Sequence, residues 1–221
     1  MQFLFDKRAE EPTIRLTGDE YRYIFRVRRA KLNDTIALRN LKDSYIYYYK
    51  IISVNRREAT LKLLSKEYLE VLPKRYLHIG WCIIEPKNVE KTIPFLNEIG
   101  VAKITFFYCK RSQRSYRLDL QRLKKIAINS SQQSGRSSIL EFAFEESLES
   151  FLRKNPEASL LDFSKKGILE ARDRDIFVVG CEGGFTKEER ELFGDRVFGF
   201  DSSAVLQSQT AATAIASILL L

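Results

Sequence analysis

The sequence predicts an α/β protein in which a small β-rich module precedes a larger domain of alternating strands and helices. Residues 1–66 contain short β-branched and aromatic runs separated by turn-forming residues. Residues 67–75 are polar and contain a proline, which is typical of a linker. From residue 77 onward, apolar runs of strand length alternate with amphipathic segments of helix length. That alternation is typical of a largely parallel sheet covered on both faces.

The first module, predicted to span residues 1–70, consists mostly of strand-forming sequence. Runs rich in Ile, Val, Thr, Tyr and Phe are bounded by Pro, Asn and Asp, which favour turns. Strands are therefore expected at Phe3–Phe5, Thr13–Leu16, Thr35–Arg39, Tyr45–Val54 and Ala59–Leu64.

One helix is expected to interrupt these strands. Thr17, followed three residues later by Glu20, is a capping box and predicts a helix that runs to about Ala30. Helical spacing gives this helix a basic face. The face consists of Arg22, Arg26 and Arg29, with Arg28 beside them. It fits contact with an external anion, and it equally fits a solvated charged surface.

The second domain, predicted to span residues 75–221, alternates between the two element types. Strands are expected at Leu77–Ile84, Lys103–Tyr108, Ser159–Asp162, Ile176–Gly180 and Arg196–Phe200. Helices are expected at Asn88–Ile99, Leu118–Gln132, near Glu145–Leu152, and at Lys187–Phe193 and Ser208–Leu221. The polar segment 133–138 is expected to be a turn outside the core.

The stretch from Gly180 to Gly184 is the most informative part of the chain. It follows an apolar strand, and its three glycines permit positive φ and close approach of a ligand to the backbone. Thr186 and Glu189 form a second capping box, so a helix begins directly after the loop with free N–H groups. In α/β proteins this arrangement marks a ligand site, although a tight turn alone would require the same glycines.

Composition and charge narrow the class of protein. The chain of 221 residues has a net charge of +8, with a basic excess in residues 1–136 and an acidic excess in residues 137–221. Such asymmetry favours a nucleic-acid partner, and a solvated surface without a partner is the other explanation. No apolar run has the length of a signal peptide or a membrane span. The widely spaced Cys82, Cys109 and Cys181 predict neither a disulfide framework nor a metal site, and they indicate a reducing cytoplasm.

Four short blocks, taken in order, resemble one known family. Phe95–Ile104 looks like the family string ending in T-E-L-G-V-x-x-I, and Gln132–Arg136 resembles E-Q-S-G-R. Gly180–Phe185 resembles G-P-E-G-G-F, and Gln209–Ala211 stands where the family has E-T-A. The blocks are similar to those of the RsmE-type 16S ribosomal RNA uridine N3-methyltransferases of the SPOUT superfamily. The likeness covers nearly the whole chain and is looser at its N-terminal end.

The resemblance implies a PUA-like β-barrel followed by a SPOUT domain whose C-terminal part forms a trefoil knot. It implies S-adenosylmethionine as cofactor and a homodimer that binds 16S ribosomal RNA or the small ribosomal subunit. By position, three loops would contact the cofactor, through Leu161, Asp162, Gly180, Cys181, Glu182, Gly183, Gly184, Phe200, Val205 and Leu206. RNA contacts are expected from Arg22, Arg26, Arg28, Arg29, Arg111, Arg114 and Arg136.

Three residues are candidates for the chemistry. Methyl transfer is an in-line displacement that depends on positioning, and the weakly acidic N3–H of uracil has to lose its proton. Glu182 is the candidate base or orienting group, or its carboxylate is simply bonded to loop N–H groups. Arg136 is expected either to stabilise charge on the pyrimidine oxygens or to bind a phosphate. Gln207 stands where the family has an arginine, and it donates hydrogen bonds without charge.

Departures from the family pattern keep other functions open. The family's arginines and glutamate are replaced at Ala204, Gln207 and Gln209. His78 is interpreted as a structural residue of an apolar strand, and Cys181 as a steric replacement for the family's proline. Two alternatives therefore stand beside the uridine methyltransferase. They are a SPOUT methyltransferase acting on another RNA and a non-catalytic RNA-binding protein of ribosome assembly.

Overall fold

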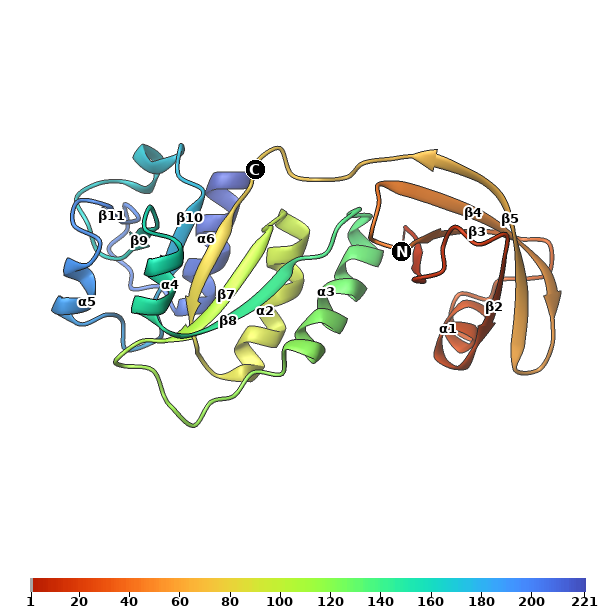
Figure 1. Ribbon diagram of the computed structural model, residues 1–221, viewed down its shortest axis with the longest axis horizontal. Coiled ribbons are helices and arrows are strands. Elements are labelled where there is room, and N and C mark those ends of the chain that lie inside the picture. Colours follow the sequence, from red (N-terminus) through yellow and green to blue (C-terminus); the bar gives the residue numbers. More distant parts are fainter. Residues whose placement is uncertain (1) are drawn as a thin grey trace. The chain divides into compact units, whose positions relative to one another are not determined.

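The computed structural model describes residues 2–221, which form two compact units (Figure 1). The first unit contains the chain up to Leu72 together with Ser131–Ser138. The second contains Pro73–Ser130 and Ile139–Leu221. The boundary after Leu72 lies inside the predicted linker, whereas the sequence pattern assigned residues 131–138 to the second domain.

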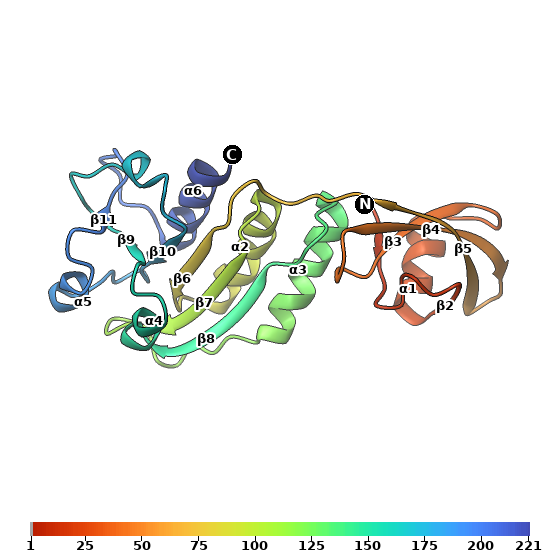
Figure 2. The same cartoon turned by 45° about the horizontal axis from the view of Figure 1, so that its top comes forward.

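The first unit is built on a curled five-stranded sheet with the order β1-β3-β4-β5-β2 (Figure 2). The strands are β1 (Leu4–Phe5), β2 (Thr13–Thr17), β3 (Thr35–Arg39), β4 (Tyr45–Val54) and β5 (Glu58–Tyr68). β1 pairs with β3 in parallel, and the other neighbours are antiparallel. In β2, Ile14 and Leu16 are buried between exposed neighbours, which is the period-two pattern of a sheet with one covered face. The five predicted strands are present, and β5 is longer than predicted.

The predicted helix of the first unit is present but changes type midway. α1 (Gly18–Arg22) is followed at once by a π-helical segment, Tyr23–Val27, with a wider turn. The predicted capping box is wrong, because the Thr17 side chain makes no cap hydrogen bond. Gly18, the next residue, has a φ of +59°, so the helix begins from a left-handed turn that glycine adopts without strain.

The second unit contains a six-stranded sheet in which all neighbouring strands are parallel, as predicted. The strand order is β11-β9-β10-β6-β7-β8. The strands are β6 (His78–Cys82), β7 (Lys103–Tyr108), β8 (Glu141–Ser147), β9 (Ser159–Leu161), β10 (Ile176–Val179) and β11 (Val197–Phe198). The central β6 is buried along its whole length, as a strand covered on both faces must be.

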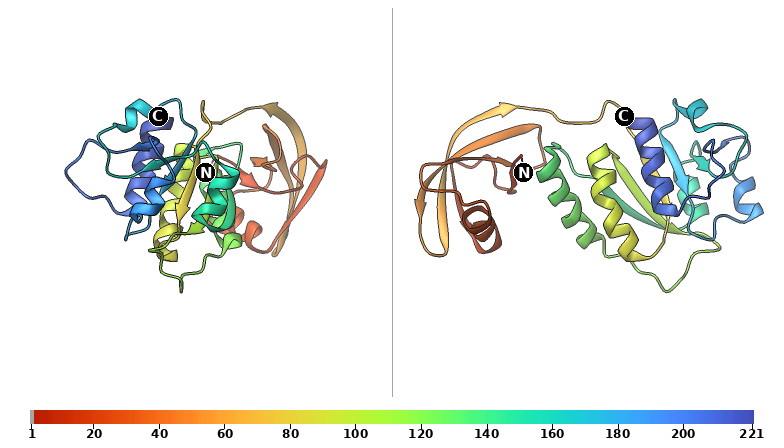
Figure 3. Two further views of the ribbon diagram at one scale, coloured as in Figure 1. Left: turned by 60° about the vertical axis from the view of Figure 1, so that its left-hand side comes forward. Right: turned by 180° about the vertical axis from the view of Figure 1, so that it is seen from behind.

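Helices cover both faces of this sheet. They are α2 (Pro86–Ile99), α3 (Leu120–Ser134), α4 (Leu148–Lys154), α5 (Lys187–Glu191) and α6 (Ser208–Leu220), with a 3-10 turn at Ile168–Ala171. The yellow, green and dark-blue helices α2, α3 and α6 lie side by side on one face (Figure 3, right). α4 covers the other face, where Phe151 stacks on Phe107 at 5.2 Å and meets the edge of the His78 ring.

One predicted helix is partly wrong. The segment near Glu145–Leu152 continues as strand β8 to Ser147, and α4 begins only at Leu148. β8 is the edge strand beside β7, and its side chains are half-buried or exposed, so its apolar alternation is weak. The strand ends where the Ser147 side chain accepts a hydrogen bond from the N–H of Ser150 at 3.2 Å and so caps α4.

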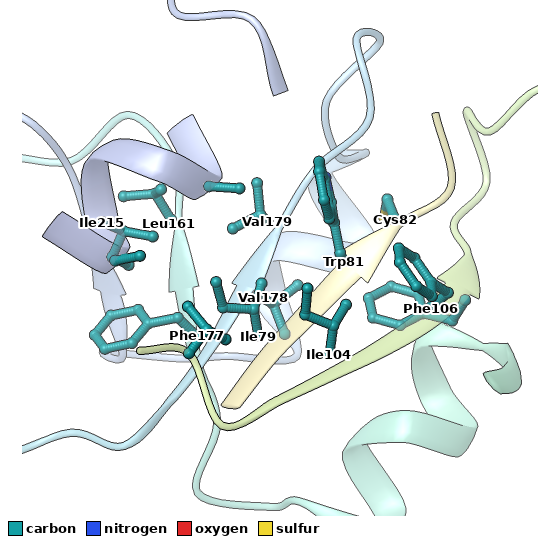
Figure 4. Packing of buried hydrophobic residues seen from close by; sticks show 14 of the residues in the cluster. Ile79, Trp81, Cys82, Ile104, Phe106, Leu161, Phe177, Val178, Val179 and Ile215 are labelled. Carbon is teal, nitrogen blue, oxygen red and sulfur yellow. The ribbon is translucent and has the colours of Figure 1, made fainter. Parts of the chain in front are cut away.

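The core of the second unit packs around β6 and β10 (Figure 4). Ile79 of β6, Val178 of β10 and Ile215 of α6 are fully buried. Trp81 is also buried, with its ring 5.9 Å from that of Phe106. This core fixes the carboxyl ends of the strands, where the loops described below begin.

Candidate cofactor and RNA-binding site

Three loops leave the same edge of the parallel sheet. β9, β10 and β11 are adjacent and parallel, so the loops that follow them begin side by side at the carboxyl edge. These loops contain the three segments predicted to contact a cofactor, which are Leu161–Asp162, Gly180–Gly184 and Phe200–Leu206. Open α/β sheets bind ligands at such an edge.

The glycine loop, Gly180–Gly184, is tightly packed at one end and open at the other. A Cβ atom at Gly180 would come within 2.9 Å of the Phe185 ring. Gly184 has a φ of +65°, and a Cβ atom there would meet nothing within 4 Å. The first position therefore needs glycine for packing, and the last needs it for its backbone conformation while leaving space beside it.

The capping box predicted at Thr186 and Glu189 is confirmed. Glu189 is buried, and its carboxylate accepts the N–H of Thr186 at 2.9 Å and the N–H of Lys110 at 2.7 Å. The same side chain thus holds the end of the glycine loop and the start of the basic loop after β7. Sequence reasoning identified the local cap but not Lys110, because no local pattern reports a contact between residues so far apart in the chain.

Ser208, the first residue of α6, is a positioning residue that sequence reasoning missed. Its hydroxyl accepts a hydrogen bond from Nε1 of Trp81 at 2.8 Å and donates to the carbonyl of Gly180. Three elements meet at this hydroxyl: β6, the glycine loop and α6. The sequence signal is weak, since Ser208 is the first residue of an apolar helix and lies after the N-cap residue Gln207.

The loop after β9 is held by an ion pair. Asp162 pairs with Arg190, which also donates to the carbonyl of Phe163. The Asp162 carboxylate is therefore engaged with α5, and its backbone N–H donates to the carbonyl of Phe198 at 2.9 Å. Leu161, 8% exposed, ends β9 at this point and offers an apolar wall.

The third loop, Phe200–Leu206, leads into α6. Val205 is 78% exposed, and Phe200 and Leu206 are half-buried. Gln207 is exposed at the N-cap of α6, and its Oε1 accepts a hydrogen bond from Nε2 of Gln209 at 2.6 Å. The two glutamines that replace charged residues of the family therefore contact each other.

Glu182 lies exposed in the middle of the glycine loop. Within residues 2–221 its carboxylate accepts no hydrogen bond, so the alternative of a carboxylate tied to loop N–H groups is not formed there. An unengaged carboxylate beside the glycine loop is available to accept a proton or to orient a base.

The basic loop after β7 is attached to the glycine loop. Arg111 donates through Nη1 to the carbonyl of Gly183 at 2.9 Å. Arg114 lies over the ring of Tyr108, with its guanidinium carbon 4.9 Å from the ring centroid. Both predicted RNA-binding arginines of this loop therefore lie at the same edge of the sheet as the glycine loop.

Arg136 lies in the first compact unit, whereas Glu182 and Gln207 lie in the second. The expectation that segment 133–138 lies outside the core is wrong for two residues, because Arg136 is 6% and Ser137 5% exposed, whereas Gln133 and Ser134 are exposed. Arg136 donates from Nε to the hydroxyl of Ser138 at 2.9 Å, and burial lowers the pKa of its guanidinium to about 10. Arg136 and Ser137 are buried despite their polarity because their polar groups find hydrogen-bond partners.

The predicted N-terminal RNA-binding residues, Arg22, Arg26, Arg28 and Arg29, are all exposed. Arg29 has a φ of +57° and lies beyond the helix, so the single helical face predicted from spacing is not formed. Arg28 and Arg29 instead border a hollow of about 530 Å³ that Tyr48 also lines. A cationic rim beside an aromatic ring is a suitable surface for RNA.

His78 is structural, as interpreted from the sequence. Its Nε2 lies 2.8 Å from the hydroxyl of Thr105, and the ring is buried. Burial, assisted by Lys103, lowers its pKa to about 4. The ring is therefore neutral at physiological pH and remote from general-base chemistry.

The three cysteines lie closer in space than their sequence spacing suggested. Cys109 follows β7 and Cys181 follows β10, and their sulfur atoms are 3.5 Å apart. Cys82 ends β6, the strand that lies between these two. All three are buried free thiols. Among residues 2–221, no group of three or more His, Cys, Asp and Glu side chains is arranged to hold a metal ion, and no helix has the length and apolarity to cross a bilayer.

Comparisons with known proteins agree over nearly the whole chain. Residues 71–220 match the family model of an RNA methyltransferase domain, and residues 16–64 match that of an RNA methyltransferase PUA domain. The ribosomal RNA small subunit methyltransferase E of Helicobacter pylori (strain ATCC 700392 / 26695) is 36% identical over 223 residues, covering 99% of each chain. The protein of that name from Aquifex aeolicus is 25% identical over 209 residues, 89% of each chain.

Solved structures share the fold. The ribosomal RNA small subunit methyltransferase E from Neisseria gonorrhoeae, bound to S-adenosyl methionine, superposes with a TM-score of 0.83 at 19% identity, covering 99% of this chain and 96% of that one. A Legionella pneumophila methyltransferase with bound cofactor SAM gives 0.83 at 22% identity, with the same coverage. From the domain matches and the full-length relatives together, this chain belongs to the RNA methyltransferase family that includes ribosomal RNA small subunit methyltransferase E.

Proposed function

We propose that this chain transfers the methyl group of S-adenosylmethionine to N3 of a uridine in the 16S ribosomal RNA of the small ribosomal subunit. The observation that carries the proposal is the convergence of three loops on one edge of the parallel sheet, in a chain of this family. The exposed arginines of both units supply the positive charge that binding to an RNA backbone requires. Because the proposed substrate is ribosomal RNA, the proposal also places the chain in the cytoplasm.

The residues of the three loops fit S-adenosylmethionine. The space beside Gly184 lets a flat ring approach the backbone, and Leu161, Phe200 and Leu206 offer apolar surface at the same edge. Backbone groups of the glycine loop would hold the polar edges of the adenosine. When bound, the cofactor supplies an electrophilic methyl group.

Two side chains of the second unit are assigned roles in the chemistry, and Arg136 of the first unit keeps the roles predicted for it. The exposed Glu182 would take the N3 proton or orient the uracil ring, and Gln207 would donate hydrogen bonds to a uracil oxygen. Arg136 remains charged at neutral pH, because its lowered pKa of about 10 still exceeds 7. That charge is what either of its predicted roles requires. Positioning then carries most of the catalysis, as expected for an in-line displacement.

We also propose that the C-terminal part of the chain forms a trefoil knot. Support comes from Gly199, where a Cβ atom would come within 2.9 Å of both the Asp162 carbonyl and the Ser164 N–H nitrogen. The backbone of Gly199 also bonds to Lys166 at 2.9 Å and to Ile168 at 2.8 Å. The two segments run parallel and very close together at this point, where Gly199 bridges to Gly167. A residue without a side chain leaves the space that one segment needs to thread past another.

A homodimer completes the proposal. Phe95 of α2 is 55% exposed and Ile218 of α6 is 36% exposed, on two helices that pack against each other. An apolar surface across neighbouring helices suits a second copy. Sedimentation of the purified chain at increasing concentration measures its oligomeric state. A purely monomeric species at micromolar concentration would exclude the dimer.

The decisive experiment is a methyl-transfer assay with labelled S-adenosylmethionine on small ribosomal subunits that lack the modification. Nucleoside mass spectrometry then identifies the product. N3-methyluridine is the expected result. A different methylated nucleoside would favour a methyltransferase with another target, and cofactor and subunit binding without any product would favour a non-catalytic assembly protein.

A further inference from the structure

We propose that Cys109 and Cys181 form an oxidation site, a thiol pair that hydroperoxides convert to a disulfide linking the basic loop to the glycine loop. The effect on the cofactor rests on the function proposed above, whereas formation of the disulfide does not. One member of the pair, Cys181, occupies the second position of the glycine loop.

The two sulfur atoms are already in contact. Their separation is 3.5 Å, and a disulfide needs about 2.05 Å, so the atoms must approach by about 1.5 Å. Both residues lie on loops just past the ends of strands, where the backbone moves more easily than inside the sheet. Gly184, which has open space beside it, adds freedom to the loop that contains Cys181.

Neighbouring groups favour the thiolate of Cys109. The hydroxyl of Ser112 lies 3.2 Å from its sulfur, and hydrogen bonds from the thiols of Cys181 and Cys82 lower its pKa. The hydrogen bond with Cys109, together with burial, raises the pKa of Cys181. These contacts favour the thiolate, the form that attacks a peroxide, at Cys109 over Cys181.

Cys82 differs from the other two. It is fully buried at the end of β6, and burial raises its pKa well above the usual value. Cys82 is held inside the sheet, whereas Cys109 and Cys181 lie on loops that can bring their sulfur atoms together. Cys82 therefore serves as an internal control, close to the reactive pair and expected to stay reduced.

The reaction balances with hydrogen peroxide as the oxidant. The thiolate of one cysteine attacks a peroxide oxygen, the O–O bond breaks, and the leaving hydroxide takes a proton to become water. The sulfenic acid formed is then attacked by the second sulfur, which displaces a second water as the S–S bond forms. Two thiols and one peroxide give one disulfide and two waters, with two electrons passing from sulfur to oxygen.

The link would change the cofactor loop. Arg111 and Glu189 already join the two loops by hydrogen bonds, which bring the sulfurs together but leave the loop free to adjust. Closing the sulfurs draws Cys181 toward β7 and breaks the contact in which its thiol faces the carbonyl of Gly184 at 4.0 Å. A shift of about 1 Å in a positioning loop costs up to about a hundredfold in activity. Cofactor affinity is expected to fall at least about tenfold.

The test uses the full-length chain, first reduced and then treated with hydrogen peroxide. Peptide mass spectrometry after alkylation is expected to find Cys109 joined to Cys181 and Cys82 alkylated. C82A should form the same link, and both C109S and C181S should lose it. Because the first measurement is made on the unaltered chain, poor folding of a variant does not prevent the test.

Calorimetric titration of S-adenosylmethionine follows on the reduced, oxidised and re-reduced chain. The expected result is binding that weakens on oxidation and recovers with dithiothreitol in the unaltered chain and in C82A. Absence of the Cys109–Cys181 peptide would overturn the oxidation site. Unchanged affinity of a fully oxidised sample would overturn its effect on the loop. A chain that forms the disulfide but binds no cofactor even when reduced would refute the proposed function and leave the oxidation site standing.

Discussion

His78 shows how one buried side chain sets a pH limit on stability. Burial and the nearby Lys103 lower its pKa to about 4, whereas a histidine in an unfolded chain titrates near 6.5. Between these two values the unfolded state binds the proton and the folded state does not. The folded state is therefore progressively destabilised as the pH falls from about 6.5 to about 4.

Lowering the pH from 7 to 4 is expected to cost the second unit up to about 3 kcal/mol through His78 alone. Denaturant unfolding at a series of pH values measures this. H78Q keeps a group that can bond to the Thr105 hydroxyl but does not titrate, so its stability should vary less over the same range. Identical pH profiles for the variant and the unaltered chain would contradict the assignment.

Glu182 is the residue whose role is most open to direct measurement. E182Q preserves the shape of this exposed side chain and removes its charge and basicity. If the carboxylate takes the N3 proton, the methyl-transfer rate should fall by about a hundredfold or more, with little change in cofactor affinity. Single-turnover kinetics and calorimetry separate the two quantities. A rate within twofold of normal would remove Glu182 from the chemistry.

Among the elements, the helical segment of the first unit departs most from its sequence pattern. Its change from α1 to a π-helical turn, and the left-handed conformation of Arg29, spread the arginines over more surface than one helix face. A spread of exposed charges suits an extended phosphate backbone better than a single anion.

Replacing Arg22 and Arg26 by Ala is expected to weaken RNA binding and to reduce the salt dependence of the affinity by roughly 0.7–0.9 per lost phosphate contact. Cofactor affinity should not change. The matched control replaces Arg56 and Arg57 by Ala. These two arginines are also exposed, and their replacement removes the same amount of charge from a different turn. Equal losses in both double variants would mean that net charge alone matters and that the helical segment has no special role.

The contact between β6 and α4 depends on a glycine. A Cβ atom at Gly80 would come within 2.6 Å of the Phe151 ring, so α4 packs against bare backbone there. G80A is expected to destabilise the second unit by about 1–3 kcal/mol through overpacking. F151L replaces the ring by a smaller side chain. It should lower the free energy of unfolding less when added to G80A than when made alone. Thermal unfolding measures the four proteins, and strictly additive effects would argue against this contact.

At the scale of the whole molecule, the first unit includes a short segment that is flanked in sequence by residues of the second unit. Residues 131–138, which are the last turn of α3 and the segment after it, belong to the first unit, where Ser137 exchanges hydrogen bonds with Val71 at 3.0 and 3.1 Å. The side chain of Gln132 also accepts the N–H of Phe5 at 2.8 Å. A fragment 73–221 lacks those partners while keeping the buried Arg136.

This fragment is expected to melt several degrees below the second unit of the full chain, since each lost buried hydrogen bond costs about 1 kcal/mol. Calorimetry of both proteins gives the difference. Q132A in the full chain removes one of these contacts, so its melting temperature should lie between that of the fragment and that of the intact chain. A fragment as stable as the intact chain would show that segment 131–138 needs no support from the first unit.

The order and type of most elements follow from the sequence, because a parallel sheet buried on both faces leaves long apolar runs such as β6 and β10. Strand β8 is absent from the prediction, and its last three residues are assigned to a helix, because an edge strand is only half-buried and its apolar alternation is weak. The glycine loop and its helix cap were predictable because both signals are local. Ser208 and the Lys110–Glu189 contact were not, since each joins segments that only the fold brings together. Arg136 was misplaced because polarity alone cannot reveal a buried partner.

The hydroxyl of Ser208 has one more consequence, which concerns the order in which the chain is made. The glycine loop is synthesised well before α6, yet its Gly180 carbonyl is held by a residue of that last helix. A nascent chain on the ribosome therefore carries every strand of the sheet before its candidate site can close. Assembly of the site therefore waits until α6 has been made and has folded, so a nascent chain that has not yet reached α6 has no finished pocket with which to modify RNA.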